Sequence, residues 1–375
     1  MKIVADDEIP FLRGTLEPFG EVIYLPGKEI NNNILRDADA LLIRTRTKCN
    51  EHLLRDTKVR FIGTATIGFD HIDNKYCDAN NIRWTNAPGC NSSSVQQYFA
   101  AALLTIASDF NFLLKDKTIG IVGVGNVGSK VARFARIIGM NVLLNDPPRA
   151  RREGGRNFVN IDRILREADI VTAHVPLTMT GEEKTYHLFD DTTFSRMKKD
   201  SWFFNSSRGE VVNTEALKDV LDSQKLGGAV IDVWENEPHI DPGLMSRVYI
   251  ATPHIAGYSA DGKANGTAMV VNSMCSFFNL SLTNWYPGNI PQPAAKALTI
   301  DGTGLSDEDV IRKAVLHTYY IKEDDEKLRC SPTGFEKQRG DYPIRREFPS
   351  YSVKLANSSE EVRSTLEKMG FRIIV

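Results

Sequence analysis

The chain has 375 residues, which at about 150 residues per domain is enough for two or three domains. It carries 46 basic and 48 acidic residues, so its formal net charge is -2. This balance argues against a protein that binds nucleic acid or anionic membranes, since such proteins usually show a basic excess. The longest apolar stretch, at about 99–107, is also far shorter than the ~20 residues that a membrane-spanning helix needs.

The first ninety residues alternate between short apolar runs and stretches with a helical pattern. Strands that alternate with helices in this way are typical of βαβ units and a parallel sheet. A long helix rich in Ala and Leu is expected at about 92–114, and a second alternation runs from Lys117 to about Pro253. The strands predicted in the first part lie at residues 2–5, 21–25, 40–43 and 60–64, with helical stretches such as 50–55 between them.

A smaller pattern follows after a helix expected at about 259–280. Three prolines within seven residues, Pro287, Pro291 and Pro293, indicate a linker. Beyond it, a capping box, Ser358-x-x-Glu361, predicts a helix that ends at Gly370. The other elements expected here are strands at 296–301, 351–355 and 371–375 and a helix at 307–321.

These elements predict two doubly wound α/β domains with parallel, Rossmann-like sheets, followed by a small C-terminal α+β domain. The first domain is discontinuous and holds residues 1–93 and 257–286, the second holds 94–256, and the third holds 287–375. The chain passes between the first two domains near Ser92 and near Gly257. We expect both crossings to act as hinges that close a cleft.

The strongest local signal is a glycine-rich turn, Gly123-x-Gly125-x-x-Gly128, between an apolar strand and an amphipathic helix. In this motif the first glycine permits the tight turn, the second lets a pyrophosphate approach the backbone, and the third lets the helix pack on the strand. A second strand ends at Asp146, 18 residues past Gly128. An acid there binds the adenosine ribose and disfavours a 2′-phosphate, so the motif predicts NAD. Arg149 leaves binding of a 2′-phosphate open as an alternative.

Three further segments place polar residues at the ends of apolar strands, and they contain Arg208, Glu237 and His254. In open α/β sheets the ligand crevice lies at those ends. An Arg can hold a carboxylate through two parallel hydrogen bonds, a His can take a hydroxyl proton near neutral pH, and a carboxylate beside that His orients it. Taken singly, each residue also has a plain structural explanation, as a surface ion pair, a loop acid or a strand-end histidine.

The cysteines indicate a reducing compartment. They are odd in number, widely spaced and without a Cys-x-x-Cys pair, which argues against a disulfide framework or a zinc site. No group of His, Cys, Asp and Glu has metal-ligand spacing, so no metal is expected. The N-terminus reaches Asp6, Asp7 and Glu8 before any apolar run, unlike a signal peptide. We therefore expect a cytoplasmic protein.

Taken together, these motifs resemble the D-isomer-specific 2-hydroxyacid dehydrogenases over about residues 1–285. The resemblance implies an NAD-dependent oxidation in which Arg208 binds the substrate carboxylate, His254 is the acid–base group and Glu237 is its partner. The family usually has Asp where this chain has Asn213 and often Thr where it has Val175, which affects only cofactor binding or local packing. The segments that carry the resemblance are 123–128, 174–178, 207–209, 232–238 and 252–257.

The resemblance also implies which residues surround the two ligands. The substrate would contact Thr45, Thr66 and Tyr258. The NAD site would be lined by Gly123, Gly125, Asn126, Val127, Gly128, Asp146, Val175, Ser206, Ser207, Arg208, Asp232 and Gly257.

A narrower resemblance, to one branch of the family, rests on residues 63–66, 87–91, 145–150 and 254–258 and on the extension after about Pro287. It implies a phosphorylated 2-hydroxy acid as substrate and a homodimer formed through the C-terminal domain. Arg44, Arg46 and Lys48 follow the strand at 40–43 and could hold the phosphate, or they form only a solvated basic loop. Arg345 or Arg346, reaching in from a second copy of the chain, is a further hypothesis for this phosphate.

Two other functions stay open at this point. A phosphoglycerate dehydrogenase of the same family often has a small C-terminal regulatory domain of similar pattern and would differ in its substrate. An NAD-sensing binding protein, like the corepressors that share this fold, can retain Arg208, Glu237 and His254 and would bind NAD without turnover.

Overall fold

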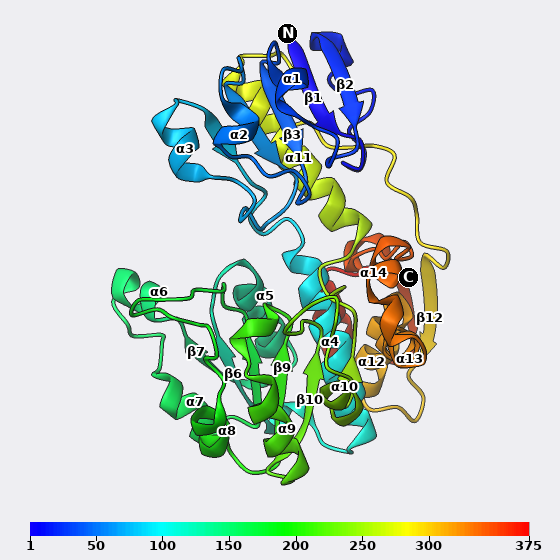
Figure 1. Cartoon of the computed structure of the whole chain (residues 1–375). Helices are drawn as coiled ribbons and strands as arrows, with labels where there is room; N and C mark the ends of the chain where they lie inside the picture. The colour runs from blue at the N-terminus through cyan, green and yellow to red at the C-terminus, as the bar shows by residue number, and fades with distance from the viewer. Residues whose placement is uncertain (375) are drawn as a thin grey trace. The chain divides into compact units, whose positions relative to one another are not determined.

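The computed structural model describes residues 1–374 and divides the chain into two compact units. The first unit holds Met1–Asn91 and Ser259–Pro291, and the second holds Ser92–Tyr258 and Gln292–Val375. The chain therefore changes unit within two residues of the crossings expected from the sequence (Figure 1). The C-terminal residues fall in the same unit as the glycine-rich turn, and the division into three domains stays a prediction.

The first unit is built on a five-stranded parallel sheet in the order β2-β1-β3-β4-β5. Helix α11 covers one face through residues such as Val270 and Met274, while α1, α2 and α3 contribute Leu35, Leu53 and Cys77 to the core on the other face. Strands β2 and β3 have the predicted bounds. The strands are β1 (Lys2–Asp6), β2 (Glu21–Leu25), β3 (Ala40–Ile43), β4 (Phe61–Thr64) and β5 (Arg83–Thr85), and the helices are α1 (Asn32–Leu35), α2 (Glu51–Leu54), α3 (Asn74–Ala79), α11 (Ala260–Phe277) and the 3-10 turn Glu17–Phe19.

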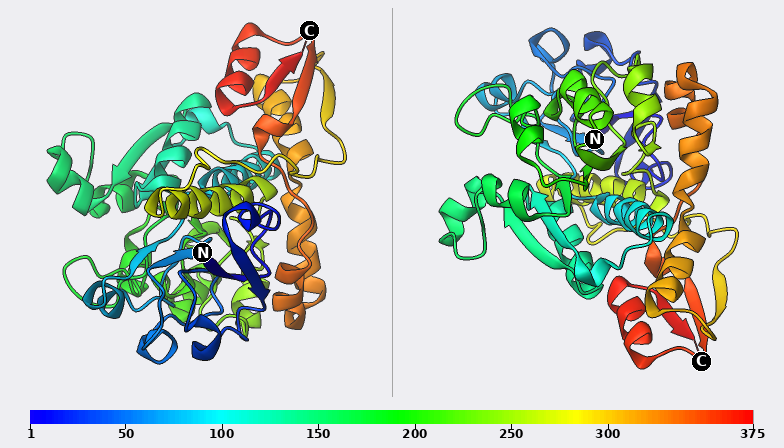
Figure 2. Two further views of the ribbon diagram at one scale, coloured as in Figure 1. Left: turned by 90° about the horizontal axis from the view of Figure 1, so that it is seen from above. Right: turned by 90° about the horizontal axis from the view of Figure 1, so that it is seen from below.

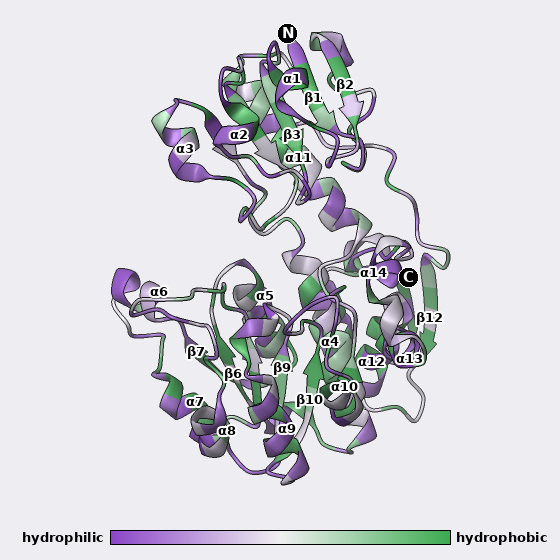
Figure 3. Ribbon diagram, in the orientation of Figure 1, coloured by the Kyte–Doolittle hydropathy of each residue, from purple (hydrophilic) through white to green (hydrophobic). Residues whose placement is uncertain are grey.

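The second unit contains a six-stranded parallel sheet in the order β11-β10-β9-β8-β6-β7. Alternate residues of a strand enter different cores: Trp202 and Phe204 pack on the side of α4 and α5, and Phe203 packs on the side of α7 to α10. Figure 3 shows these strands as largely apolar. The strands are β6 (Thr118–Val122), β7 (Asn141–Asn145), β8 (Ile170–Ala173), β9 (Ser201–Asn205), β10 (Leu226–Ile231) and β11 (Ile250–Ala251). The helices are α4 (Ser92–Asp109), α5 (Asn126–Ile137), α6 (Pro147–Glu153), α7 (Ile161–Glu167), α8 (Asp191–Arg196), α9 (Thr214–Asp222) and α10 (Pro242–Arg247), with 3-10 turns at Leu114–Asp116 and Gly209–Val211.

The order of this sheet fixes where a ligand can bind. From β6 the chain moves to one side to form β7 and then returns to the other side to form β8, β9, β10 and β11 in sequence. The reversal leaves a crevice at the carboxyl end of β6, which is where doubly wound sheets bind their ligands. Both sheets confirm the predicted doubly wound α/β class.

The C-terminal residues of this unit share a core with the sheet. Helix α4 packs against α5 and also against α12 and α13 (Figure 2). One cluster of buried side chains joins Phe99 of α4 to Val315 and Val353. A three-stranded parallel sheet, β12-β13-β14, completes this part. Its elements are β12 (Ala297–Asp301), α12 (Asp307–Thr318), α13 (Ile321–Cys330), α14 (Phe335–Gly340), β13 (Ser352–Ala356), α15 (Glu360–Met369) and β14 (Arg372–Ile374), with 3-10 turns at Pro332–Gly334 and Phe348–Ser350.

Three details of the predicted elements were wrong. The helix expected at 92–114 ends at Asp109, and Asn111 follows with a left-handed φ of 52° that stops it. The helix expected at 307–321 ends at Thr318 because Tyr319 is extended, and α13 then starts separately. The predicted capping box does not form: Ser358 donates to the carbonyl of Ala356, and Ser359 caps α15 alone, with Val362 where a box needs Glu or Gln.

Other boundaries shifted only at their ends, and Val375, the last residue of the final predicted strand, lies outside the described residues. No helix within residues 1–374 is long and apolar enough to cross a membrane.

Candidate active site

The glycine-rich turn lies at the carboxyl end of β6, in the crevice that the strand order creates. Gly123 has a φ of 88°, and a Cβ there would lie 2.5 Å from the carbonyl oxygen of His174. A Cβ on Gly128 would lie 2.0 Å from the carbonyl oxygen of Gly123, so α5 can approach the turn only without a side chain there. The two glycines thus have the conformational and packing roles predicted from the motif.

A cavity of about 450 Å³ opens beside this turn. Gly125 is exposed, and a Cβ placed on it would meet no atom within 4 Å, so the backbone there is open to a phosphate. Helix α5 begins with Asn126 directly after Gly125, which presents unpaired backbone N–H groups to an anion. Of the predicted cofactor residues, the cavity is lined by Gly123, Gly125, Asp146 and Val175.

Asp146 lines this cavity, and Arg149 follows it in α6. The Asp146 carboxylate accepts hydrogen bonds from the backbone N–H groups of Val124 and Arg149, both at 2.9 Å, which holds α6 against the glycine turn. The guanidinium of Arg149 is paired with Glu153 at 2.8 Å and also contacts the carbonyl of Val124. Because its charge is compensated by Glu153, Arg149 is poorly suited to hold a 2′-phosphate.

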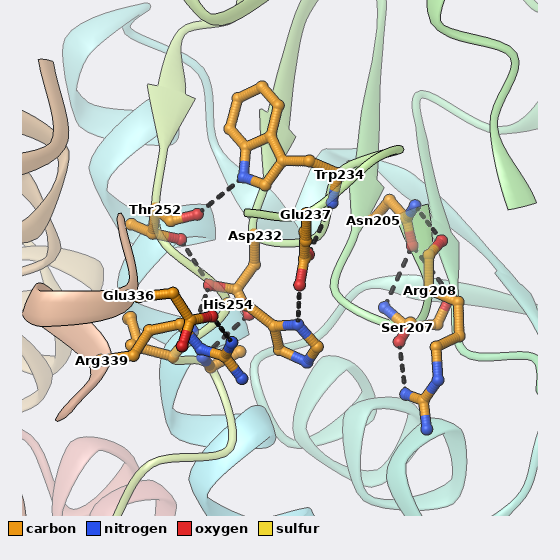
Figure 4. Close-up of polar contacts among 12 residues, drawn as sticks. Asn205, Ser207, Arg208, Asp232, Trp234, Glu237, Thr252, His254, Glu336 and Arg339 are labelled. Atoms are coloured by element: carbon orange, nitrogen blue, oxygen red, sulfur yellow. Dashed lines mark hydrogen bonds and ion pairs between the residues drawn. The ribbon is translucent and has the colours of Figure 1, made fainter. Parts of the chain in front are cut away.

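The three predicted acid–base residues follow neighbouring strands of one sheet. Arg208 comes after β9, Glu237 lies in the segment after β10, and His254 comes after β11. Figure 4 shows Glu237 directed at the ring of His254, with Arg208 in a neighbouring loop. The structure therefore brings these residues to one edge, as expected from the strand ends.

His254 and Glu237 form a close pair. The Nδ1 atom of His254 lies 2.7 Å from Oε2 of Glu237, and Oε1 of Glu237 accepts from the backbone N–H of Trp234 at 2.9 Å. Burial raises the pKa of Glu237, but its bonds to His254 and Trp234 and the nearby charge of Arg339 outweigh burial, so the pKa lies below its ordinary value. An ionised carboxylate only accepts hydrogen bonds, so Nδ1 carries the proton and Nε2 stays available for a substrate.

The segment that carries His254 is anchored by a buried carboxylate. Asp232 accepts from the hydroxyl of Thr252 at 2.6 Å and from the backbone N–H groups of Ile255 and Ala256 at 2.8 and 2.9 Å. His254 itself has a left-handed φ of 57°. Burial raises the pKa of Asp232, while His254 and these three donors act in the opposite direction. The carboxylate faces the backbone of its own loop, and its predicted contact with the cofactor stays a prediction.

The loop of Arg208 is shaped by Asn205, the last residue of β9. Its side-chain oxygen accepts from the N–H and the hydroxyl of Ser207, and its side-chain nitrogen donates to the carbonyl of Arg208 at 2.9 Å. The guanidinium of Arg208 rests on the carbonyl of Ser207 at 2.7 Å. The side chain is only partly buried, so it is available to an anionic substrate.

Arg339 of α14 is a further cation at this site, and the sequence analysis missed it. It pairs with Glu336 at 3.0 Å and lies over the ring of Tyr258, 5.9 Å from the ring centre. Figure 4 shows it beside His254. It is separated from His254 by more than eighty residues of sequence, and no motif around it marks a site.

The predicted substrate residues fall in different units. Tyr258 belongs to the second unit, where it packs edge-on against Tyr342. Thr45 and Thr66 belong to the first unit: Thr45 is exposed, and the hydroxyl of Thr66 lies 2.7 Å from that of Thr64. In the same unit Arg44 forms an ion pair with Glu8 at 3.0 Å. A common substrate contact of the three residues stays a prediction.

Arg345 and Arg346 are both buried in their own chain, which argues against the hypothesis that they reach into a second copy.

A second histidine–carboxylate pair lies nearby. Nε2 of His187 is 2.7 Å from Oε1 of Glu235, and the other oxygen of Glu235 accepts from the N–H of Thr214 at the start of α9. Tyr186 stacks on the imidazole. Both side chains of the pair are therefore occupied in fixing a helix start. Among residues 1–374, no group of three or more His, Cys, Asp or Glu side chains is arranged to hold a metal ion.

His174 should make stability depend on pH. Burial lowers its pKa from 6.5 to about 3 in the folded chain, where its Nε2 bonds Thr172 and its ring meets Phe99. Between pH 6.5 and about pH 3 the unfolded chain binds a proton at this histidine that the folded chain does not. The free energy of unfolding therefore has its full value above about pH 6.5. It falls as the pH is lowered, by at most about 1.4 kcal/mol per pH unit. In urea titrations from pH 7 to 4, His174→Gln should show a smaller loss than the parent chain. An equal loss in both would contradict the assignment.

Comparisons with known proteins agree with this geometry. Residues 105–256 match the family described as D-isomer specific 2-hydroxyacid dehydrogenase, NAD binding domain, and residues 290–370 match a family described only as a domain of unknown function. Among solved structures, the D-lactate dehydrogenase of Aquifex aeolicus complexed with NAD and lactic acid has a TM-score of 0.59 at 26% identity and covers 74% of this chain and 96% of its own.

Curated relatives match nearly the whole chain. The erythronate-4-phosphate dehydrogenase of Bacteroides thetaiotaomicron is 49% identical over 354 residues, which are 94% of this chain and 99% of the relative. The protein of the same name from Proteus mirabilis is 39% identical over 99% of both chains.

Proposed function

Because the chain belongs to the D-isomer-specific 2-hydroxyacid dehydrogenases and, within them, to the erythronate-4-phosphate dehydrogenases, we propose that it oxidises 4-phospho-D-erythronate to (R)-3-hydroxy-2-oxo-4-phosphooxybutanoate with NAD as acceptor. The observation that carries this proposal is the His254–Glu237 pair beside Arg208, in a chain similar to those dehydrogenases over nearly its full length. The reaction is a step in the biosynthesis of pyridoxal phosphate, vitamin B6.

His254 removes the proton of the substrate's C2 hydroxyl. Glu237 holds Nδ1, so the proton moves to Nε2 and the imidazolium that forms is stabilised by the carboxylate. The hydroxyl oxygen becomes the carbonyl oxygen of the product as the C2–H bond breaks. The hydrogen of C2 leaves with both electrons of that bond, as a hydride, and NAD when bound supplies the carbon that accepts it.

Arg208 holds the substrate carboxylate and thereby orients C2. A guanidinium can donate two parallel hydrogen bonds to a carboxylate, which fixes its plane as well as its position. Releasing the carbonyl of Ser207 would free the Nη1 donor for this contact. Tyr258, Thr45 and Thr66 would hold the rest of the substrate, and Arg44, Arg46 and Lys48 would supply positive charge for its phosphate.

The NAD site is formed by the turn Gly123–Gly128 and the residues around it. The amides at the start of α5 would bind the pyrophosphate, and Asp146 would bind the adenosine ribose. Val175 lines the cavity beside Gly123. The remaining predicted contacts are Asn126, Val127, Ser206, Ser207, Asp232 and Gly257.

The reaction can be tested by mixing the purified chain with NAD and 4-phospho-D-erythronate and following nicotinamide absorbance, with a trap for the oxo acid. We expect absorbance to rise with the parent chain and with NAD far more than with NADP. Arg208→Ala should raise KM and lower kcat. Activity on 3-phosphoglycerate alone would favour a phosphoglycerate dehydrogenase, and NAD binding without turnover of either acid would favour an NAD sensor.

The assembly and compartment are further parts of the proposal. The five cysteines are free, and four of them are buried, which suits a reducing compartment such as the cytoplasm. A homodimer formed through residues 287–375 would give twice the chain's mass of 41.9 kDa by light scattering. A mass equal to one chain at micromolar concentration would contradict the dimer.

A further inference from the structure

Arg345 is a cation buried in the C-terminal part of the second unit, in the segment between α14 and β13. Only 4% of the residue's surface is exposed. Its guanidinium lies 4.4 Å from the ring centre of Tyr319 and 5.7 Å from that of Tyr342. The hydroxyls of both tyrosines donate to Asp324, at 2.9 and 2.7 Å. The side chain is thus held in one orientation from both sides.

The guanidinium is directed at the segment that follows His254. Its Nη2 atom donates to the carbonyl of Ala256 at 2.6 Å and to that of Ile255 at 3.1 Å, and it lies 2.5 Å from the hydroxyl of Ser94. Ser94 also donates to the carbonyl of Ala256, at 2.9 Å. A residue of the C-terminal region therefore bonds two carbonyls one and two positions beyond His254.

The same two residues are bonded on their other side by Asp232, which accepts from the N–H groups of Ile255 and Ala256. The carbonyls thus face a buried cation, and the amides face a buried carboxylate. Both charges favour the same orientation of the peptide dipoles, so they act together on the conformation of residues 254–256. Either charge alone would leave one side of this backbone less tightly held.

We propose that Arg345 is a positioning residue of the dehydrogenase site, which acts by holding the backbone that presents His254 and Tyr258. This rests on the proposed function, because it assigns a catalytic consequence to the segment. It also gives the C-terminal region a role inside the active site of its own chain, in addition to any role in dimerisation.

Stability alone does not account for a charge at this place. Burying an ion costs several kcal/mol, which a well-packed neutral side chain of similar volume would avoid. A guanidinium, in contrast, can donate to several carbonyls in a fixed geometry. The carbonyls that Arg345 bonds are those of Ile255 and Ala256, directly after His254.

The chain offers a matched control in Arg329 of α13. This arginine also belongs to the C-terminal region and also donates to backbone carbonyls of the NAD-binding part, those of Met245 and Val248, at 2.7 and 2.8 Å. These carbonyls precede β11, whereas those bonded by Arg345 follow it. Arg329 bonds none of residues 252–258 itself, although its ion-pair partner Asp325 accepts from the N–H of Ala251 in β11. Arg329→Met therefore removes an anchor that acts before the segment of His254.

The experiment compares Arg345→Met, Arg345→Lys and Arg329→Met with the parent chain, at a temperature where all four are folded by circular dichroism. We expect Arg345→Met to lower kcat about 10- to 100-fold with a much smaller change in KM, since a displacement of about 1 Å can cost about 100-fold. Arg345→Lys should recover part of the loss, and Arg329→Met should keep kcat. Unchanged kcat in Arg345→Met, or an equal loss in Arg329→Met, would overturn the proposal.

Hydrogen–deuterium exchange of residues 252–258 separates this proposal from the proposed function. Exchange of this segment should be faster in Arg345→Met and unchanged in Arg329→Met, whatever the substrate is. If the parent chain does not oxidise 4-phospho-D-erythronate but exchange responds as expected, the proposed function fails and the hold of Arg345 on this segment stands. If exchange of residues 252–258 is the same in Arg345→Met as in the parent chain, Arg345 does not position this segment.

Discussion

Replacing His254 with Ala is expected to lower kcat about 1000-fold, since a positioned acid–base group contributes about 100- to 10,000-fold. The variant would lack the acceptor for the hydroxyl proton, while the glycine turn and its cavity lie in other loops. NAD affinity should therefore stay close to that of the parent chain. Steady-state kinetics with 4-phospho-D-erythronate and a fluorescence titration with NAD measure the two effects separately.

The matched control for this variant is His187→Ala, because His187 and His254 have the same 2.7 Å distance to a glutamate. His187 fixes the start of α9 through Glu235 and touches no predicted substrate group. His187→Ala should lower the free energy of unfolding by about 1 kcal/mol, which is the usual contribution of one hydrogen bond, and should leave kcat nearly unchanged. Equal losses of kcat in the two variants would show that a general loosening, and not proton transfer, explains the effect.

Replacing Asp232 with Ala is expected to lower the free energy of unfolding by about 3–5 kcal/mol. The substitution leaves the N–H groups of Ile255 and Ala256 without an acceptor in a buried place, and each such group costs about 1–3 kcal/mol. The hydroxyl of Thr252 also loses Asp232 but can still donate to the hydroxyl of Tyr98, 2.8 Å away. Urea unfolding at pH 7 measures the change. Asp232→Asn keeps one oxygen and should lose less.

Asp241→Ala is the control for that measurement. Asp241 also accepts a backbone N–H, that of Leu244 at 2.7 Å, but it does so at the partly exposed start of α10. The loss of such a cap costs about 1 kcal/mol. If Asp232→Ala lowers the free energy of unfolding by no more than Asp241→Ala does, water or neighbouring groups replace the carboxylate as the hydrogen-bond acceptor.

The parts of the fold that the sequence predicts well are those with local causes. Strands β2 and β3 have the predicted bounds because each is a short apolar run between polar turns. The glycine turn was found because Gly123 and Gly128 are required by backbone geometry within six residues. The residues Arg208, Glu237 and His254 meet at one edge because parallel strands end on the same side of a sheet.

The parts that were missed depend on contacts between distant residues. Whether Ser358 or Ser359 caps α15 is decided by a competing hydrogen bond to Ala356, which spacing alone does not reveal. Arg339 and Arg345 belong to the C-terminal region, whose helices α12 and α13 pack on α4, and nothing in their sequence neighbourhood marks them. Thr45 and Thr66 were reached only through the family resemblance, because neither lies in a motif with a chemical meaning of its own.

Helix α4 has a consequence for how this chain could be recombined with its relatives. Fourteen of its eighteen residues are buried, and its side chains serve the NAD-binding sheet and the C-terminal helices at once. A hybrid that exchanges only residues 292–375 would therefore join two surfaces that were shaped separately, with misfit along α4 and around Arg345. Exchanging α4 and the segment 252–258 together with the C-terminal region would keep these complementary surfaces as one transferable block.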